Sequence, residues 1–262
     1  MGASGRPMEK FIQDTAKEAV VAVLKRFGKD GVHYMKSEHS WDVVTKADLI
    51  SEKIIMSRIR KAYPDHGIIS EESGNFNEGA EYVWIIDPID GTLNFSRGVP
   101  LFGVMICLMH KGEVVLSVID LPAAHELFFA KKGGGAYCNG KRIRCSQKRT
   151  LNQSFGAGSA RLDGRAAVFL EKLIRTARNQ NIQYASFFSM AVNACYVACG
   201  RRDWAVPLAG MVWDFAPAYL ILKESGCTVT DIQGKPWALH KSEMLAANPH
   251  LHKELLKLTK DI

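Results

Sequence analysis

Two closely spaced aspartates, Asp87 and Asp90, are the first residues of this sequence whose type and spacing suggest chemistry. They come directly after the apolar residues 84–86, and Pro88 and Gly91 accompany them. This pattern predicts a buried strand that ends in a turn, which is where the active sites of α/β sheets tend to lie. Two neighbouring carboxylates repel each other unless a cation neutralises them, and their hard oxygen atoms favour Mg²⁺ or Ca²⁺. The same spacing is also typical of a solvent-exposed turn whose aspartates cap a helix.

Acidic residues next to apolar runs occur at two further places. Glu71 and Glu72 follow the apolar residues 68–69, and Asp214 lies between hydrophobic neighbours where a helix is predicted to begin. Carboxylates in such surroundings need partners when they are buried. Asp214 is expected either to cap its helix as the N-cap residue or to hold a metal, and a capping carboxylate can do both.

The composition is that of an ordinary folded protein, with 47% hydrophobic and 23% charged residues among 262. Such a chain is unlike disordered or fibrous sequences, and its length fits one domain or two fused halves. The net charge of +7 would suit an anionic partner such as a phosphorylated metabolite, RNA or an acidic protein. The densest basic cluster, residues 141–149, follows a predicted turn without an aromatic stacking motif, so we interpret it as solvated surface rather than a nucleic-acid site.

Neither a targeting segment nor a membrane segment is predicted. The sequence begins without the basic flank and apolar run of a secretory signal, and no apolar run approaches the ~20 residues that span a bilayer. The longest candidate, residues 99–109, is better interpreted as a buried strand. The expected location is therefore the cytoplasm.

The six cysteines are widely spaced and form no Cys-x-x-Cys pair, so neither a zinc ribbon nor a redox motif is predicted. Cys195 and Cys199 lie one helical turn apart, but no nearby His or Cys completes a metal site. We expect free thiols that fill the core.

Two amphipathic helices are predicted at the start of the chain, before any sheet. The first covers residues 8–27, whose apolar positions recur at helical spacing, and Gly28 is its expected C-cap. The second begins with a capping box, in which Asp48 follows Thr45 and takes the place of the usual glutamate, and it ends before Pro64.

Short apolar and β-branched runs then predict a sheet with hairpins. Its strands are expected at residues 82–87, 101–110, 113–120 and 124–131. Tight turns are predicted at Lys111-Gly112 and at Asn139-Gly140.

The rest of the chain alternates between strands and helices. Strands are predicted near residues 154, 184, 204 and 228 and at 244–247, and helices at 164–178, 189–199, 214–226 and after residue 249. The whole pattern predicts a layered α/β (α+β) fold. A helix-and-antiparallel-sheet half is expected at about 8–150, followed by an alternating half at about 151–262.

Several of these segments, taken together, closely resemble the inositol monophosphatase family of magnesium-dependent, lithium-sensitive phosphatases. The strings that carry the resemblance most specifically are Glu71-Glu72-Ser73, Asp87-Pro88-Ile89-Asp90-Gly91-Thr92 with Asn94-Phe95, and Trp213-Asp214. Further matching segments are Val44-Thr45-Lys46-Ala47-Asp48, Gly135-Ala136-Tyr137-Cys138-Asn139-Gly140, Ala191-Val192-Asn193, Gly200 with Asp203, and Ala246-Ala247-Asn248. The resemblance covers nearly the whole chain, and it implies a single domain over residues 1–262 with the layered αβαβα sandwich of the sugar phosphatases.

The resemblance also implies a metal site for two or three Mg²⁺ ions. Glu71, Asp87 and the backbone carbonyl of Ile89 would hold the first metal. Asp87, Asp90 and Asp214 would hold the second.

The same resemblance assigns the remaining catalytic roles. Glu71 and Thr92 would orient and deprotonate the attacking water, while backbone amides of Gly91 and Thr92 would bind the phosphate. The expected reaction is in-line attack of water on phosphorus without a covalent intermediate. Substrate contacts are implied for Asp90, Gly91, Thr92, Ser189 and Asp214.

Lys36 and Asp48 match positions that lie near the metal cluster in the family. A surface lysine and a carboxylate at a helix start would look the same in the sequence, so both interpretations stay open. The resemblance further implies a homodimer, which composition alone does not establish.

Two positions depart from the branch of the family that acts on inositol phosphate. An acidic residue about seven positions before the Trp-Asp aspartate usually contacts the sugar hydroxyls there, and this chain has Pro207 instead. A side chain without donor or acceptor cannot read hydroxyl groups. The Gly-Ser/Thr-Ala string that lines the substrate pocket reads Phe188-Ser189-Met190, which keeps Ser189 between bulkier neighbours. We therefore expect intact chemistry with altered specificity.

The expected activity is hydrolysis of inositol monophosphate or a similar small phosphate ester. Histidinol phosphate, fructose bisphosphate and nucleotide bisphosphates stay open as substrates of the same enzyme class. From another class, a regulatory protein on this fold could bind RNA or a transcription complex through its basic surface. The four acidic metal ligands argue against a purely non-enzymatic role.

Overall fold

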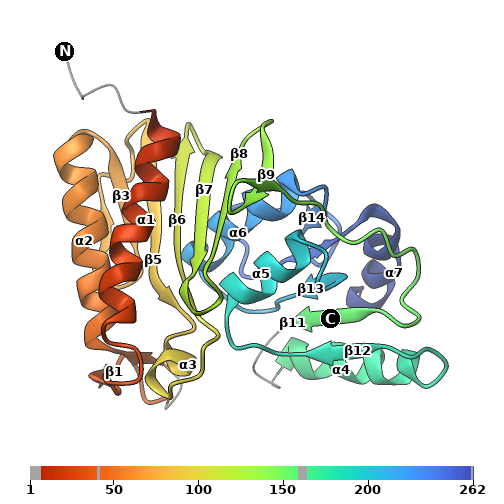
Figure 1. The fold of residues 1–262 in the computed structure, drawn as a ribbon. Coiled ribbons are helices and arrows are strands. Elements are labelled where there is room, and N and C mark those ends of the chain that lie inside the picture. The colour runs from red at the N-terminus through yellow and green to blue at the C-terminus, as the bar shows by residue number, and fades with distance from the viewer. Residues whose placement is uncertain (1–6, 40–41, 159–163, 261) are drawn as a thin grey trace.

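The computed structural model describes residues 7–39, 42–158, 164–260 and 262. Helices and sheets alternate in layers across the molecule, in the order helix, sheet, helix, sheet, helix (Figure 1). Helices α1 (Met8–Leu24) and α2 (Lys46–Ala62) cover the outer face of the first sheet. Helices α5 (Met190–Ala198) and α6 (Val212–Glu224) lie between the two sheets. Helices α4 (Gly164–Ala177) and α7 (Pro249–Thr259) cover the outer face of the second sheet. The predicted layered α/β sandwich is confirmed.

The first sheet has eight strands in the order β10-β9-β8-β7-β6-β5-β3-β4. Only β3 and β5 run parallel among its neighbouring strands, and the other pairs are antiparallel. In chain order the strands are β3 (Gly67–Ser70), β4 (Gly74–Phe76), β5 (Tyr82–Asp90), β6 (Gly103–His110), β7 (Glu113–Leu121), β8 (Glu126–Lys131), β9 (Gly135–Cys138) and β10 (Lys141–Arg142). The predicted tight turns at Lys111-Gly112 and Asn139-Gly140 join neighbouring strands, and all four residues have the positive φ angles that such hairpin turns require.

The second sheet has five strands in the order β12-β11-β13-β15-β14. Strand β11 is parallel to both of its neighbours, whereas β15 is antiparallel to its own. The strands are β11 (Phe155–Gly158), β12 (Gln183–Ala185), β13 (Trp204–Val206), β14 (Thr228–Thr230) and β15 (Leu245–Ala247). They lie where the alternating pattern of the second half predicted them.

Buried side chains of the described residues form three clusters between the layers. One lies between the first sheet and α1 with α2, one around α5 and α6 between the sheets, and one between the second sheet and α4 with α7. The middle helices α5 and α6 have apolar residues on most of their surface, because both of their faces are covered by a sheet. This middle layer is where the first and second halves of the chain meet.

The end of the first helix was predicted incorrectly. Helix α1 ends at Leu24 rather than at Phe27, and Gly28 adopts a positive φ of 74° within the turn that follows. The ring of Phe27 packs instead against Phe95 and Phe102, with centroid distances of 5.6 and 4.9 Å. Its apolar character therefore reflects this tertiary contact and not a continuing helix.

The expectation that two helices precede any sheet was also wrong. A short antiparallel pair, β1 (Tyr34–Met35) and β2 (Val43–Val44), lies between α1 and α2. Its strands are only two residues long, so they leave no periodic signal in the sequence. Strand β8 begins at Glu126 and not at the predicted residue 124, because a 3₁₀ turn occupies Pro122–Ala124.

All six cysteines are free thiols, as predicted, and most of them are buried. Within the described part of the chain, no helix has both the length and the apolar character needed to cross a membrane.

Candidate active site

The end of strand β5 carries Asp87 and Asp90, and an irregularity in its pairing brings their side chains together. Asp87 is paired with Met105 and Asp90 with Gly103, so β5 has one residue more than β6 between these two pairs. Side chains three residues apart on a regular strand point to opposite faces, and one extra residue returns them to the same side. Pro88, which has no backbone N–H for the ladder, lies within this irregularity.

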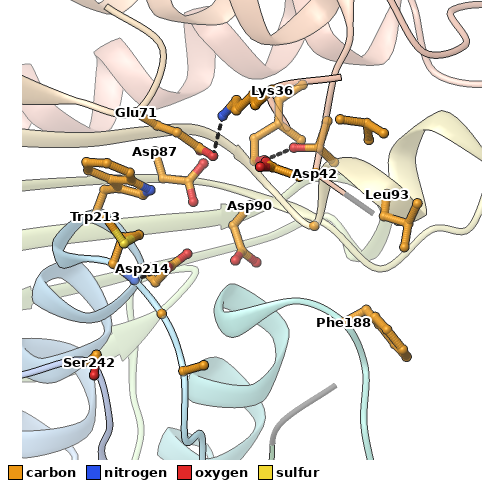
Figure 2. A pocket seen from close by; sticks show the side chains of 17 residues that line it. Lys36, Asp42, Glu71, Asp87, Asp90, Leu93, Phe188, Trp213, Asp214 and Ser242 are labelled. Atoms are coloured by element: carbon orange, nitrogen blue, oxygen red, sulfur yellow. Dashed lines mark hydrogen bonds and ion pairs between the residues drawn. The ribbon is translucent and has the colours of Figure 1, made fainter. Parts of the chain in front are cut away.

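Asp214 reaches the same place from the middle helix layer. Helix α6 begins at Val212, two residues earlier than predicted, so Asp214 is its third residue rather than its N-cap. Its Oδ2 atom accepts a hydrogen bond from the backbone N–H of Met211 at 2.5 Å, which caps the helix and fixes the carboxylate. Carboxylate oxygens of Asp87, Asp90 and Asp214 all lie within 4.8 Å of one another. Figure 2 shows these side chains and Glu71 turned toward one common space.

Asp90 is anchored to the start of helix α5. Its carboxylate accepts hydrogen bonds from the backbone N–H groups of Met190 and Ala191, at 2.9 and 2.8 Å, and from the hydroxyl of Ser189. Burial raises the pKa of Asp90 to about 6, although these hydrogen bonds lower it. Ser189 therefore lies beside the cluster, where the sequence placed a substrate contact.

The other two aspartates are in a less favourable electrostatic environment. Burial, followed by the charges of Glu71 and Asp90, raises the pKa of Asp87, and its Oδ1 atom has no hydrogen-bond partner in the described structure. Burial and then the charge of Asp90 raise the pKa of Asp214 to about 8. No ion pair between described residues neutralises the three aspartates. An all-oxygen, largely buried and uncompensated cluster of this kind fits one or more hard divalent cations such as Mg²⁺.

Glu71 extends the cluster and is held by Lys36. Glu71 follows β3, which is parallel to β5, and its backbone N–H donates to the carbonyl of Ile86 at 3.3 Å. The ammonium of Lys36 lies 2.7 Å from carboxylate oxygens of both Glu71 and Glu72. Although burial alone lowers it, these two carboxylates raise the pKa of Lys36, which keeps the lysine charged. Lys36 is thus a partner of the acidic cluster and not a free surface lysine.

Asp48 connects the second helix to Thr92. It accepts the backbone N–H of Thr45 at 2.8 Å, which confirms the predicted capping box of α2. Its other oxygen lies 3.0 Å from the Thr92 hydroxyl, which is also 2.7 Å from the carbonyl of Ile89. Burial raises the pKa of Asp48 to about 6. Asp48 therefore caps a helix, and it also lies within hydrogen-bond distance of Thr92, a residue proposed for the site.

Gly91 lies between Asp90 and helix α3 (Thr92–Ser96), and its backbone allows the close packing of this segment. It has a φ of 82°, a conformation that favours glycine. A Cβ atom at this position would approach the carbonyl oxygen of Leu101 to 2.8 Å and the Cβ of Ser189 to 3.1 Å. Glycine is thus required both for the conformation and for the space.

These groups open into one pocket of about 690 Å³. Of the residues that the sequence analysis placed in the site, Lys36, Glu71, Asp87, Ile89, Asp90, Gly91, Thr92 and Asp214 line it. Pro207 and Ser189 line an adjoining recess of about 140 Å³, which shares Asp90 and Asp214 with the larger pocket. The basic residues 141–149 line neither space.

Several further residues line the two spaces and were not predicted from the sequence as site residues. They are Asp42, Val43, Leu93, Ala209, Gly210, Met211 and Ser242 in the pocket, and Gly158, Asn193 and Phe215 in the recess. They come from loops and element ends that are distant in sequence, and most are small or apolar. No local pattern distinguishes such residues from ordinary core or loop positions.

Comparison with known proteins gives consistent matches over nearly the whole chain. The family model described as the inositol monophosphatase family matches residues 5–262. A fructose-1,6-bisphosphatase/inositol-1-monophosphatase from Thermotoga maritima is 37% identical over 221 residues, which cover 84% of this chain and 84% of that protein. The Nus factor SuhB of Pasteurella multocida is 37% identical over 256 residues, or 95% of this chain and 94% of that protein.

A solved structure shows the same arrangement of elements. The extragenic suppressor protein suhB from Bartonella henselae superimposes with a TM-score of 0.89 at 32% identity, and the match covers 96% of this chain and 98% of that one. The fold, the extent of these matches and the acidic cluster at the end of β5 agree. The chain therefore belongs to the inositol monophosphatase family.

Proposed function

We propose that this protein is a Mg²⁺-dependent phosphomonoesterase that hydrolyses small phosphate esters by direct attack of water. The observation that carries the proposal is the cluster of the buried Asp87 and Asp90 with the half-buried Asp214, whose carboxylate oxygens lie within 4.8 Å of one another. Among the described residues, no ion pair neutralises these three side chains. Membership of a metal-dependent phosphatase family supports the same conclusion.

Glu71, Asp87 and the Ile89 carbonyl would hold one Mg²⁺ ion, and Asp87, Asp90 and Asp214 a second. When bound, such ions lower the pKa of water, neutralise phosphoryl oxygens and stabilise the leaving alkoxide. The carboxylates would then be ionised, because a nearby cation favours the charged form of each group.

The remaining side chains can orient the attacking water. If the Thr92 hydroxyl donates to Asp48, 3.0 Å away, its lone pairs are free to accept a hydrogen bond from water. Asp48, whose pKa burial raises to about 6, is suited to receive a proton from this hydroxyl near neutral pH. Lys36 keeps the Glu71 carboxylate oriented beside this path.

The proposal is tested by measuring phosphate release from glycerol 2-phosphate, inositol 1-phosphate, fructose bisphosphate, histidinol phosphate and a nucleotide bisphosphate. Activity should require Mg²⁺ and be lost in excess chelator. Asp214→Asn keeps an oxygen to cap Met211 but removes a charged ligand, and should lower kcat at least about a hundredfold.

A matched control is Asp30→Asn, which removes a carboxylate that pairs with Arg26 at 3.1 Å outside the pocket. This variant should retain turnover within about twofold. Hydrolysis that persists undiminished in chelator or in the Asp214→Asn variant would falsify the metal assignment.

A second candidate function is a regulatory role in transcription. It is supported by the name of the Pasteurella multocida relative, a Nus factor, and by the net charge of +7. Salt-sensitive RNA binding that survives in the Asp214→Asn variant would support this role beside catalysis.

We also propose that the protein forms a homodimer in the cytoplasm and is inhibited by lithium. Sedimentation tests the dimer, localisation measurements test the cytoplasmic location, and inhibition measurements test the effect of lithium.

A further inference from the structure

A second pocket, of about 430 Å³, lies apart from the active site. It shares no lining residue with the active-site pocket or its recess. The turn between β6 and β7, Lys132 after β8, the second half of α6 and the loop 237–240 surround it, and we call it the distal pocket. Lys223, which lines it, comes nine residues after Asp214 in α6, or roughly 13 Å along the helix axis. Pockets of about 300–1,000 Å³ commonly hold small molecules, so the distal pocket has the size of a ligand site.

The buried side chains that line the distal pocket are apolar or aromatic. Val114 and Trp237 are each 6% exposed, and Leu220 is 1% exposed. The ring of Trp237 lies 5.1 Å from that of Tyr219, with an angle of 32° between the two planes. The Nε1 atom of Trp237 has no hydrogen-bond partner among the described residues, although buried donors are usually paired. These side chains offer contact to a planar apolar ring, and the indole N–H is a donor for a ligand oxygen.

The two acidic residues of the distal pocket are engaged by other groups of the protein. The carboxylate oxygens of Glu224 accept the backbone N–H groups of Gly133 and Gly135, at 2.8 Å each. The carboxylate of Glu113 forms an ion pair with the ammonium of Lys132. A cationic ligand would therefore have to replace one of these partners.

Lys223 is held by a neutral group instead. Its ammonium donates to the hydroxyl of Tyr219 at 2.9 Å and lies 5.2 Å from the centroid of the same ring. No carboxylate of the described residues forms an ion pair with it. The hydrogen bond with Tyr219 raises the pKa of Lys223, although burial lowers it, so the lysine is charged at neutral pH. A fixed cation without an ionic partner, beside an apolar surface, favours an anionic ligand.

We propose that the distal pocket binds a small aromatic carboxylate, with its ring against Trp237 and Tyr219 and its carboxylate at the ammonium of Lys223. Such a molecule matches both the apolar and the cationic parts of the pocket. One negative charge suits the pocket better than two, because Glu113 and Glu224 lie close enough to act on the charge of Lys223 and would repel a dianion more strongly. The ligand would lie away from the phosphate ester, so this inference goes beyond the proposed phosphatase function and does not depend on it.

The test is isothermal titration calorimetry at low ionic strength with 2-naphthoate, the neutral 2-naphthalenemethanol and acetate. We expect 2-naphthoate to bind one site per chain with a Kd of about 1 mM or below. The neutral alcohol lacks the charge and should bind at least about fivefold more weakly, whereas acetate, which lacks the ring, should show no measurable binding. Mg²⁺ together with inorganic phosphate, which are expected to occupy the active site, should not displace 2-naphthoate.

Two variants locate the ligand in the distal pocket. Lys223→Met keeps most of the apolar stem but removes the charge, so it should weaken 2-naphthoate about fivefold or more and leave the neutral alcohol unchanged. Ala238→Phe places a ring in the pocket itself and should weaken both ring compounds. Lys257→Met is the matched control, because Lys257 is an exposed lysine in the last turn of α7 and does not line the distal pocket. It should leave binding unchanged, and thermal unfolding verifies that each variant is folded.

Four results would overturn this inference. They are no measurable binding of 2-naphthoate, equal binding of 2-naphthoate and the neutral alcohol, no effect of Lys223→Met, and displacement by Mg²⁺ with phosphate. None of these measurements uses phosphate release. A protein that binds 2-naphthoate through Lys223 but hydrolyses no ester would therefore contradict the proposed function and leave this inference standing.

Discussion

At the scale of single residues, Asp90 has two roles that are difficult to separate by mutation. Its carboxylate accepts hydrogen bonds from the N-terminal turn of α5, so it joins the first sheet to the middle helix layer. It also belongs to the acidic cluster. Removing it would disturb the fold and the site together. Asp214→Asn is the more informative variant, since an asparagine oxygen can still cap Met211.

Pro207 is the residue at which specificity for inositol phosphate can be tested. It lines the recess next to Asp90 and Asp214 and offers no hydrogen-bond donor or acceptor on its side chain. Pro207→Glu supplies an acceptor for substrate hydroxyls. The variant should gain about ten- to two-hundred-fold in kcat/KM for inositol 1-phosphate relative to glycerol 2-phosphate, which corresponds to about 1–3 kcal/mol.

A thermal unfolding measurement should accompany this assay, so that an unfolded variant is recognised. If wild type already prefers inositol 1-phosphate over glycerol 2-phosphate by more than about a hundredfold, other residues read the hydroxyls and this account of Pro207 is wrong.

At the scale of elements, the short connection between β5 and α3 sets the positions of Asp90 and Thr92. Gly91→Ala would strain this connection, because the residue has a φ of 82° and a Cβ would come within 2.8 Å of the Leu101 carbonyl oxygen. We expect a loss of about 2–3 kcal/mol in the free energy of unfolding, together with a lower kcat.

The variant Gly98→Ala separates the effect of the positive φ from the effect of the close contact with Leu101. Gly98 has a similar φ of 71°, but a Cβ there would meet no atom within 4 Å. This variant should lose only about 1 kcal/mol and keep its turnover, as judged by urea unfolding and phosphate release. Equal losses in the two variants would show that the close approach to Leu101 contributes nothing.

At the scale of the whole molecule, the buried carboxylates link stability to pH and to Mg²⁺. The folded-state pKa values of Asp90 and Asp214 are raised, to about 6 and about 8. At low pH these carboxyl groups are protonated and stabilise the folded, metal-free protein. This stabilisation is lost as pH rises through their folded-state pKa values. We expect the Tm of the metal-free protein to fall between about pH 5 and pH 8.5.

Saturating Mg²⁺ should counter this fall, because it binds the ionised carboxylates of the folded state. The increase in Tm caused by Mg²⁺ should thus be larger at pH 8 than at pH 5.5. Asp214→Asn removes one titrating group and should show a shallower pH dependence without metal. A Mg²⁺ effect that is independent of pH in wild type would contradict the assignment of these residues.

Much of the fold was predictable because its signals are local. The capping box at Thr45 and Asp48 and the hairpin turns at Lys111-Gly112 and Asn139-Gly140 depend on a few adjacent residues. The end of α1 was not predictable, since Phe27 continues the helical spacing but packs against Phe95 and Phe102. Helical spacing of apolar residues indicates which side chains are buried, but it does not indicate which residues those side chains contact.

For the site, the sequence by itself determined which carboxylates are available and, through its resemblance to a family, what they are expected to do. Only the tertiary structure decided that they meet. The pairing irregularity at Pro88 turns Asp87 and Asp90 to one side, and helix α6 then brings Asp214 to them from the other half of the chain. The strained conformation of Phe188 was likewise invisible in the sequence. Strand register and contacts between distant segments depend on the packing of whole layers, which no local pattern of residues encodes.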